Sequence, residues 1–113
     1  MAGDPDPPAP GPAGYHVSID PPALDRAVTA LRGMAYEHRL HILVLLRAGE
    51  TTPSALAAAI PAHPTAVSHH LRHLVDAGLI RRRRDGRRML YSLRGAAAAR
   101  LIDEVLRYTG SAQ

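Results

Sequence analysis

Apolar residues recur at helical spacing in five stretches of the chain, and proline or glycine marks most of their ends. This period predicts helices. In the first stretch Asp20 can cap the helix, and Pro21 suits the first turn, where its missing N–H is not needed. The five helices are expected at about residues 20–33, 36–47, 52–60, 64–77 and 96–108.

Residues 79–93 show a different pattern, with two short runs on either side of Asp85-Gly86. Such a dipeptide typically forms the two-residue turn of a β-hairpin. Apolar residues lie at the base of the hairpin and arginines at its tip. The two short helices before it, 52–60 and 64–77, are separated by only a few residues, which predicts a helix-turn-helix. The fold class is therefore mainly α with a β-hairpin wing (α+β): a winged helix-turn-helix of four helices, a hairpin and a fifth helix.

The helix at 64–77 has two unlike faces. At 100° per residue, Val67, Leu71 and Leu74 fall on one side, and His70 lies nearer that side, which favours a packed, hydrogen-bonded histidine. In winged-helix proteins the first half of such a helix enters the major groove. The side chains predicted to face the bases are those of Thr65, Ser68, His69 and Arg72. Arg72 could read a guanine or hold a phosphate, and the sequence leaves both open.

Charge supports the same interpretation. The chain has 113 residues, a formal charge of +4 and fourteen cationic side chains, all of them arginine, and six of these lie between Arg81 and Arg88. The planar guanidinium matches phosphate with two parallel hydrogen bonds. We therefore expect the wing arginines to follow phosphates or enter the minor groove, and hydroxyls at the start of the 52–60 helix to meet the backbone. These predicted contacts are Thr52, Ser54, Arg84, Arg87 and Arg88.

The composition also sets limits. There is no cysteine, which excludes disulfides, thiolate nucleophiles and thiolate metal sites. Ser, His and Asp occur, but no Gly-flanked nucleophile, phosphate loop or zinc-protease helix, so we expect no enzyme. No apolar segment approaches membrane-spanning length and no signal pattern begins the chain, so a cytoplasmic protein without membrane contact is expected.

Two regions are expected along the chain. Residues 1–19 are rich in Pro, Gly and Ala and are predicted to form a disordered arm, whereas 20–110 form one domain. A core of about 90 residues is marginal alone, so burial against a second copy would help. An apolar stripe on the last helix favours such a partner. The stripe consists of Ala98, Leu101, Ile102 and Val105.

A series of short motifs resembles the ArsR/SmtB family of bacterial winged-helix transcription regulators. The motifs span about residues 30–93 and comprise Arg39-Leu40-x-Ile42-Leu43, Leu56-Ala57, Ala66-Val67-Ser68-x-His70-Leu71-x-x-Leu74, Ala77-Gly78-Leu79-Ile80, Gly86-Arg87 and Tyr91-Ser92-Leu93. The resemblance implies a homodimer joined through the first and last helices, which adds Leu24, Val28 and Leu31 to the interface. It also implies binding to an inverted repeat in operator DNA, with repression as the first expectation, and an effector that is often a metal ion.

The family's two common metal sites are not matched. Where one uses cysteines, this chain has Thr52 and Ser54; where the other uses carboxylate and histidine, it has Gly95, Ala97, Tyr108 and Ser111.

Seven histidines without cysteine nevertheless suit Ni²⁺, Co²⁺ or Zn²⁺. A non-standard site would draw on His16, with Asp103 and Glu104 as oxygen ligands. The sequence leaves two alternatives open. Either the protein binds no effector directly, or it is an activator or another regulator whose sensing depends on a partner protein or a non-metal signal.

Overall fold

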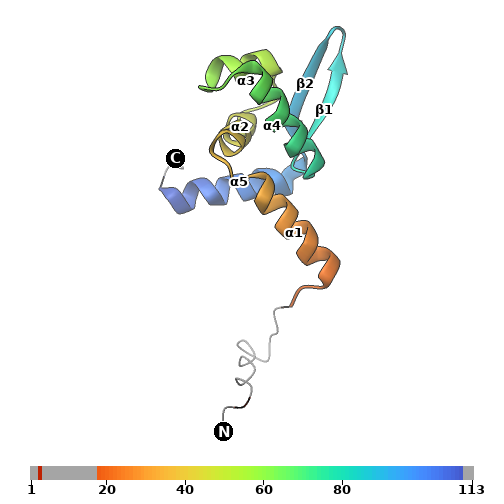
Figure 1. Cartoon of the computed structure of the whole chain (residues 1–113), viewed down its shortest axis with the longest axis vertical. Helices are drawn as coiled ribbons and strands as arrows, with labels where there is room; N and C mark the ends of the chain where they lie inside the picture. The colour runs from red at the N-terminus through yellow and green to blue at the C-terminus, as the bar shows by residue number, and fades with distance from the viewer. Residues whose placement is uncertain (1–2, 4–17, 111–113) are drawn as a thin grey trace.

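The computed structural model describes residue 3 and residues 18–110, and its elements follow the predicted order (Figure 1). The third and fourth helices form the helix-turn-helix, and a hairpin and a long helix complete the described chain. Their bounds are α1 Pro21–Gly33, α2 Glu37–Arg47, α3 Pro53–Ala59, α4 Pro64–Asp76, β1 Ile80–Asp85, β2 Arg88–Leu93 and α5 Gly95–Thr109. The predicted fold class is confirmed.

Helix α1 begins at a side-chain cap and ends at a glycine that packs closely against the end of α4. The Asp20 carboxylate accepts a hydrogen bond from the Ala23 N–H at 3.3 Å, which satisfies one of the free donors of the first turn. At its other end, Gly33 lies against α4: a Cβ added at Gly33 would be 2.8 Å from the Cβ of Ala77. The glycine therefore permits a close approach of α1 to α4.

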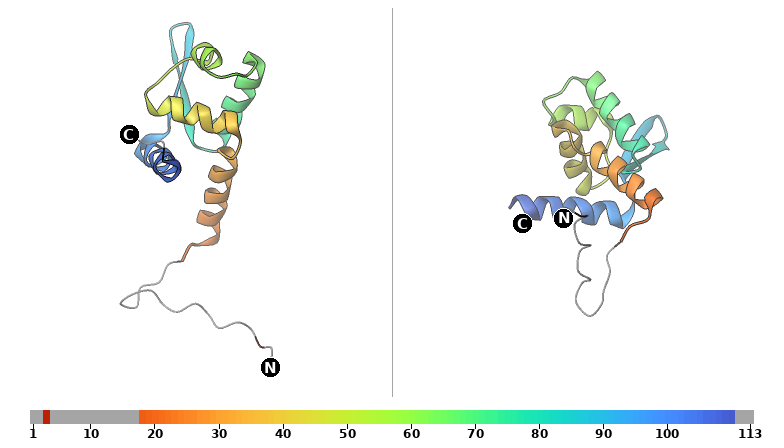
Figure 2. Two further views of the ribbon diagram at one scale, coloured as in Figure 1. Left: turned by 90° about the vertical axis from the view of Figure 1, so that its left-hand side faces the viewer. Right: turned by 60° about the horizontal axis from the view of Figure 1, so that its bottom comes forward.

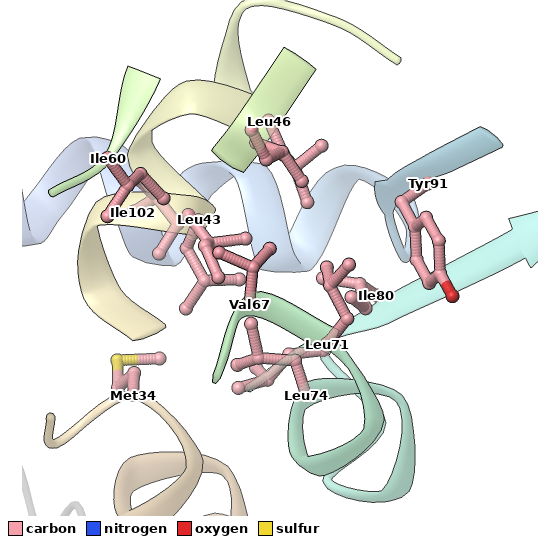
Figure 3. Close-up of a cluster of buried hydrophobic side chains, with 13 residues drawn as sticks. Met34, Leu43, Leu46, Ile60, Val67, Leu71, Leu74, Ile80, Tyr91 and Ile102 are labelled. Atoms are coloured by element: carbon pink, nitrogen blue, oxygen red, sulfur yellow. The ribbon is translucent and has the colours of Figure 1, made fainter. Parts of the chain in front are cut away.

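The core lies where α2, α3 and α4 meet the hairpin and α5 (Figure 3). Each helix contributes an apolar face, and burial of these faces supplies most of the stabilisation. Tyr91 packs beside Ile80 with its hydroxyl directed away from the cluster (Figure 3). The most completely buried side chains are Ile42, Leu43, Leu56, Val67, Leu71, Leu74, Ile80 and Ile102.

The hairpin turn differs by one residue from the prediction. Asp85 pairs with Arg88 in the antiparallel register, so the two turn residues are Gly86 and Arg87 rather than Asp85 and Gly86. Gly86 adopts φ +64°, the left-handed conformation that suits the first central position of such a turn. The shift extends both strands to the tip and brings the Asp85 carboxylate to 3.2 Å from the Arg88 guanidinium.

The prediction that Ile102 lies at the dimer interface was wrong. Ile102 is 1% exposed and belongs to the core of its own subunit, because the hydrophobic face of α5 that packs on α2 includes it. Its neighbours in the predicted stripe, Ala98, Leu101 and Val105, are only half-buried. Helix α1 differs from α5: it extends away from the rest of the subunit (Figure 2), and its apolar residues Leu24, Val28 and Leu31 are exposed.

The predicted N-terminal arm, residues 1–19, lies almost wholly outside the described residues, and so does His16. Within residues 18–110, none of the helices combines the length and the hydropathy that crossing a membrane requires.

Candidate nucleic-acid interface

Helix α4 presents the predicted polar face to solvent. Its start is set by His63, whose Nδ1 accepts a hydrogen bond from the Thr65 N–H at 3.1 Å, and by Pro64 in the first turn. Histidine thus caps this helix where serine or threonine is more usual. The inward face is almost fully buried, which holds the helix in one rotation about its axis. All four predicted base-facing residues are exposed: Thr65, Ser68, His69 and Arg72.

The start of α3 is built from two hydroxyls. The Thr52 hydroxyl accepts a hydrogen bond from the Ala55 N–H at 3.2 Å and lies 3.2 Å from the Ser54 hydroxyl. Thr52 is half-buried and Ser54 exposed, so Ser54 is the more accessible of the two. The preceding residue, Thr51, exchanges two backbone hydrogen bonds with Tyr91, at 3.0 and 2.8 Å. This bridge ties the start of α3 to the wing.

The wing arginines are exposed but not equivalent. Arg88 pairs with Asp85, whereas no carboxylate of residues 18–110 forms an ion pair with Arg84 or Arg87. Arg83 makes two hydrogen bonds of 2.8 Å to Glu50, in the loop before α3. Exposed pairs of this kind exchange readily for another anion. Of the three wing arginines predicted to contact DNA, Arg84 and Arg87 are therefore more available to phosphate than Arg88.

Glu50 was not predicted as part of this interface. Its bidentate hydrogen bonds with Arg83 hold the pKa of the Glu50 carboxyl below its usual value. The contact fixes the base of the wing to the α2–α3 loop. Its partners are 33 residues apart, and no local pattern connects them.

A groove between α4 and the wing joins the two predicted contact surfaces. It has a volume of about 410 Å³, and its lining includes Ser68, Arg72 and Arg82, with Asp76 as the one opposing charge. Arg82 was missed at this position. Because alternate residues of a strand share a face, Arg82 lies on the side of Ile80, toward α4, and a period-two count would have found it. Arg82 thus adds a cationic side chain between the polar face of α4 and the arginines at the tip of the wing.

His70 does not belong to the polar surface. Its ring packs edge-on against that of His38 in α2, with 5.8 Å between ring centroids. Burial, and then the nearby charge of His38, lowers the pKa of His70 below 6.5. The prediction of a packed histidine is confirmed, although no hydrogen bond from its ring is formed within residues 18–110.

The two predicted metal ligands that lie within the described residues, Asp103 and Glu104, are each paired with an arginine. Asp103 accepts two hydrogen bonds from Arg47, at 2.7 and 3.0 Å, which lower the pKa of its carboxyl. Glu104 pairs with Arg107 at 3.2 Å. Among residues 18–110 no three His, Asp or Glu side chains are close enough to hold a metal ion. A site there would first have to displace an arginine.

Comparison with known proteins agrees with this geometry. The profile described as "Bacterial regulatory protein, arsR family" matches residues 37–82, from α2 into β1. The HTH-type transcriptional regulator NmtR of Mycobacterium tuberculosis is 39% identical over 88 residues, which cover 78% of this chain and 73% of that protein. The chain belongs to the ArsR family. It is a DNA-binding transcriptional regulator.

Two further relatives of this ArsR-family regulator bear on its structure and action. The homodimeric winged helix-turn-helix DNA-binding domain of Mb0332 from Mycobacterium bovis, a possible ArsR-family transcriptional regulator, superposes with a TM-score of 0.73. It is 34% identical, and the match covers 77% of this chain and 81% of that one. The transcriptional activator HlyU of Vibrio cholerae is 31% identical over 69% of this chain and 72% of its own length. The predicted resemblance is therefore confirmed.

Proposed function

We propose that this regulator binds an inverted repeat in operator DNA as a homodimer and represses the adjacent promoter. The observation that carries the proposal is the arrangement of unlike surfaces at two ends of the subunit. The polar face of α4 and the wing lie at one end, and the exposed apolar face of α1 lies at the other (Figure 1). Two copies joined at the apolar end present two α4 helices to one side of a duplex.

The dimer is supported by exposed apolar area and by a relative. Leu24, Val28 and Leu31 lie along α1 and are 39–57% exposed, which is unfavourable in water unless a partner covers them. The Mb0332 domain of M. bovis is homodimeric. In such dimers the half-sites lie about one helical turn apart, roughly 34 Å along the duplex.

In the proposed complex α4 contacts bases and its surroundings contact phosphates. Ser68 and His69 donate or accept single hydrogen bonds, and Arg72 is long enough for either a guanine or a phosphate. Arg82 lines the groove beside Arg72 and adds a phosphate contact. Ser54 offers a hydroxyl at the start of α3.

The wing provides the sharpest test. Replacing Arg84, Arg87 and Arg88 by Ala should weaken binding to every sequence. It should also lower the slope of log affinity against log salt by about one unit for each phosphate that the variant no longer binds. Fluorescence anisotropy with an operator duplex at several salt concentrations measures both effects. Arg100→Ala, in the exposed part of α5, is the matched control and should leave the slope unchanged. A triple variant with the wild-type slope would contradict the assignment of the wing.

The sign of regulation is a separate question. Repression follows if the dimer occupies the promoter, but the relative HlyU is a transcriptional activator, which favours activation as the second candidate. A reporter fused to the regulator's own promoter distinguishes the two. Deleting the regulator raises expression under repression and lowers it under activation.

A metal response stays a prediction. It rests on seven histidines and on His16, which lies outside the described residues. Calorimetric titration of the full chain with Ni²⁺ tests it, with Co²⁺ and Zn²⁺ as comparisons. Affinity no tighter than that of an exposed histidine pair would reject the hypothesis, and sensing would then fall to a non-metal ligand or a separate partner protein.

A further inference from the structure

A second cavity lies on the side of the subunit where α1 ends, α2 begins and α4 finishes. Its volume is about 520 Å³. Three elements far apart in sequence form its walls, so a ligand there would touch all three. Its lining consists of Thr29, Arg32, Gly33, Ala35, Tyr36, Arg39, His73, Asp76 and Ala77.

The cavity has more cationic than anionic side chains. Arg32 and Arg39 line it together with the imidazole of His73, and Asp76 is the one acidic side chain among the lining residues. Within residues 18–110 neither arginine takes part in an ion pair. The wing and α5, by contrast, neutralise several of their arginines with carboxylates. The cations of this cavity therefore have unused capacity for an anion.

Arg39 is the strongest indication of a ligand. Its Nε is buried, and no group of the described chain accepts a hydrogen bond from it. A buried donor without an acceptor is costly, and such atoms in folded proteins usually have a partner. The guanidinium stacks 4.0 Å from the centre of the Tyr36 ring, which restricts its orientation. The stacking thus fixes the guanidinium beside the cavity that Arg39 lines, with one donor unsatisfied.

The backbone at the start of α2 also favours an anion in this cavity. Helix α2 begins beside the cavity with Tyr36 as its cap residue, and no side chain accepts hydrogen bonds from its first turn. Free N–H groups at a helix start favour negative charge. Glu37, in that first turn, opposes this effect but does not line the cavity.

The cavity is not part of the DNA surface. It lies at the junction of α1 with the body of the subunit, whereas α3 and the wing tip lie at the opposite end (Figure 1). None of the predicted DNA-contact residues lines it. The predicted operator contacts therefore leave the two arginines of this cavity without a ligand.

We propose that this cavity binds the phosphate group of a small ligand. Two guanidinium groups and an imidazole suit a doubly charged oxyanion, which accepts several hydrogen bonds at once. Arg32, Arg39 and His73 donate from the three walls, and a small movement of the Arg39 side chain would let its buried Nε donate as well. The volume leaves room for an organic group beyond the phosphate, beside the exposed Tyr36 ring.

A ligand in this cavity would also contact α4, the helix proposed to bind DNA. His73 lies one helical turn after His69 of the polar face, so a ligand that draws His73 toward Arg32 and Arg39 would act directly on α4. Any influence on operator affinity rests on the proposed function. Phosphate binding itself does not rest on it and is measured with inorganic phosphate alone, with a DNA duplex as a separate comparison.

Inorganic phosphate serves as the probe, added to the ¹⁵N-labelled full chain at an ionic strength held constant with KCl. The Arg39 Nε–H resonance and the backbone amides of residues 36–39 should shift and saturate. Arg32→Gln, at an exposed position compatible with folding, should weaken phosphate binding by at least about tenfold, the usual loss for a charge-assisted hydrogen bond. Arg26→Gln, on the same helix but outside the cavity, should leave the affinity unchanged.

Four outcomes would overturn the proposal. Shifts that never saturate would mean weak, non-specific association of phosphate with the surface, and equal affinity in Arg32→Gln would mean that phosphate does not bind in this cavity. Tighter binding of acetate than of phosphate would mean a carboxylate site. Saturation of the Arg39 signal by a DNA duplex but not by free phosphate would mean a contact with the DNA backbone. Operator binding would stay intact under the first three outcomes, so failure of this site is distinguishable from failure of the proposed function.

Discussion

Helices α1 and α4 have the same length and the same kind of start, yet they use their apolar faces in opposite ways. Each has 13 residues, a side-chain cap and a proline in the first turn. In α4 the residues Val67, Leu71 and Leu74 are at most 1% exposed. In α1 Leu24, Val28 and Leu31 are 39–57% exposed. Amphipathic character alone therefore does not tell whether a helix completes its own subunit.

The difference follows from what each helix contacts. Helix α4 packs against α2, α3 and β1, which surround its apolar side. Helix α1 forms no extensive contact with any described element, and its last residue, Gly33, lies close to Ala77 at the end of α4. The α4 face stabilises folding, while the α1 face stays exposed in the subunit and would be covered in the proposed dimer. Three predictions test this contrast.

The largest effect is expected in α4. Leu71→Ala should lower the free energy of unfolding by about 2–5 kcal/mol, because it leaves a cavity in a tightly packed core. The loss should be the same at every protein concentration. Leu31→Ala is the matched control: its effect on the free energy of unfolding should shrink as the protein is diluted below its dissociation constant, since it acts through association. Denaturant unfolding at two concentrations measures both. If both variants lost the same free energy of unfolding at every protein concentration, the two apolar faces would not differ in role.

A change in oligomeric state is expected from α1. Replacing Leu24, Val28 and Leu31 together by Gln should produce a helical monomer, because the substituted side chains are already exposed in the subunit. Sedimentation velocity measures the mass, and far-ultraviolet circular dichroism measures the helix content. Substitution of Asp25 and Arg26, on the polar side of the same helix, should leave the dimer intact. A dimer that survives the triple substitution would place its interface elsewhere.

The smallest effect is a pH dependence within α4. His70 has a lowered pKa in the folded chain, so the unfolded chain binds the proton more readily. Stability should be unaffected above about pH 6.5, should fall as pH drops below 6.5, and should level off once pH is below the folded pKa. His70→Gln should lose this part of the pH profile, and His69→Gln, which is exposed, should keep it. Thermal unfolding between pH 5 and 8 measures this dependence of stability on pH. Identical pH profiles for His70→Gln and His69→Gln would contradict the prediction.

Much of the interface could be predicted from local patterns. The helical period and the exposed positions of Ser68, His69 and Arg72 were correct because the burial of one face of α4 determines the other. The arginines of the hairpin were placed correctly, but the turn was shifted by one residue. Gly86 suits either of two turn registers, and strand pairing selects between them.

The amino-acid sequence by itself determined the elements, their order, their caps and the separation of polar from apolar faces. These depend on neighbours within about four residues, and such neighbours are legible along the chain. The tertiary structure decided the rest: that Ile102 belongs to the core, that Glu50 holds Arg83, and that Asp103 is engaged by Arg47. The two ion pairs join residues 33 and 56 positions apart, and only the folded packing of helices and wing brings them into contact.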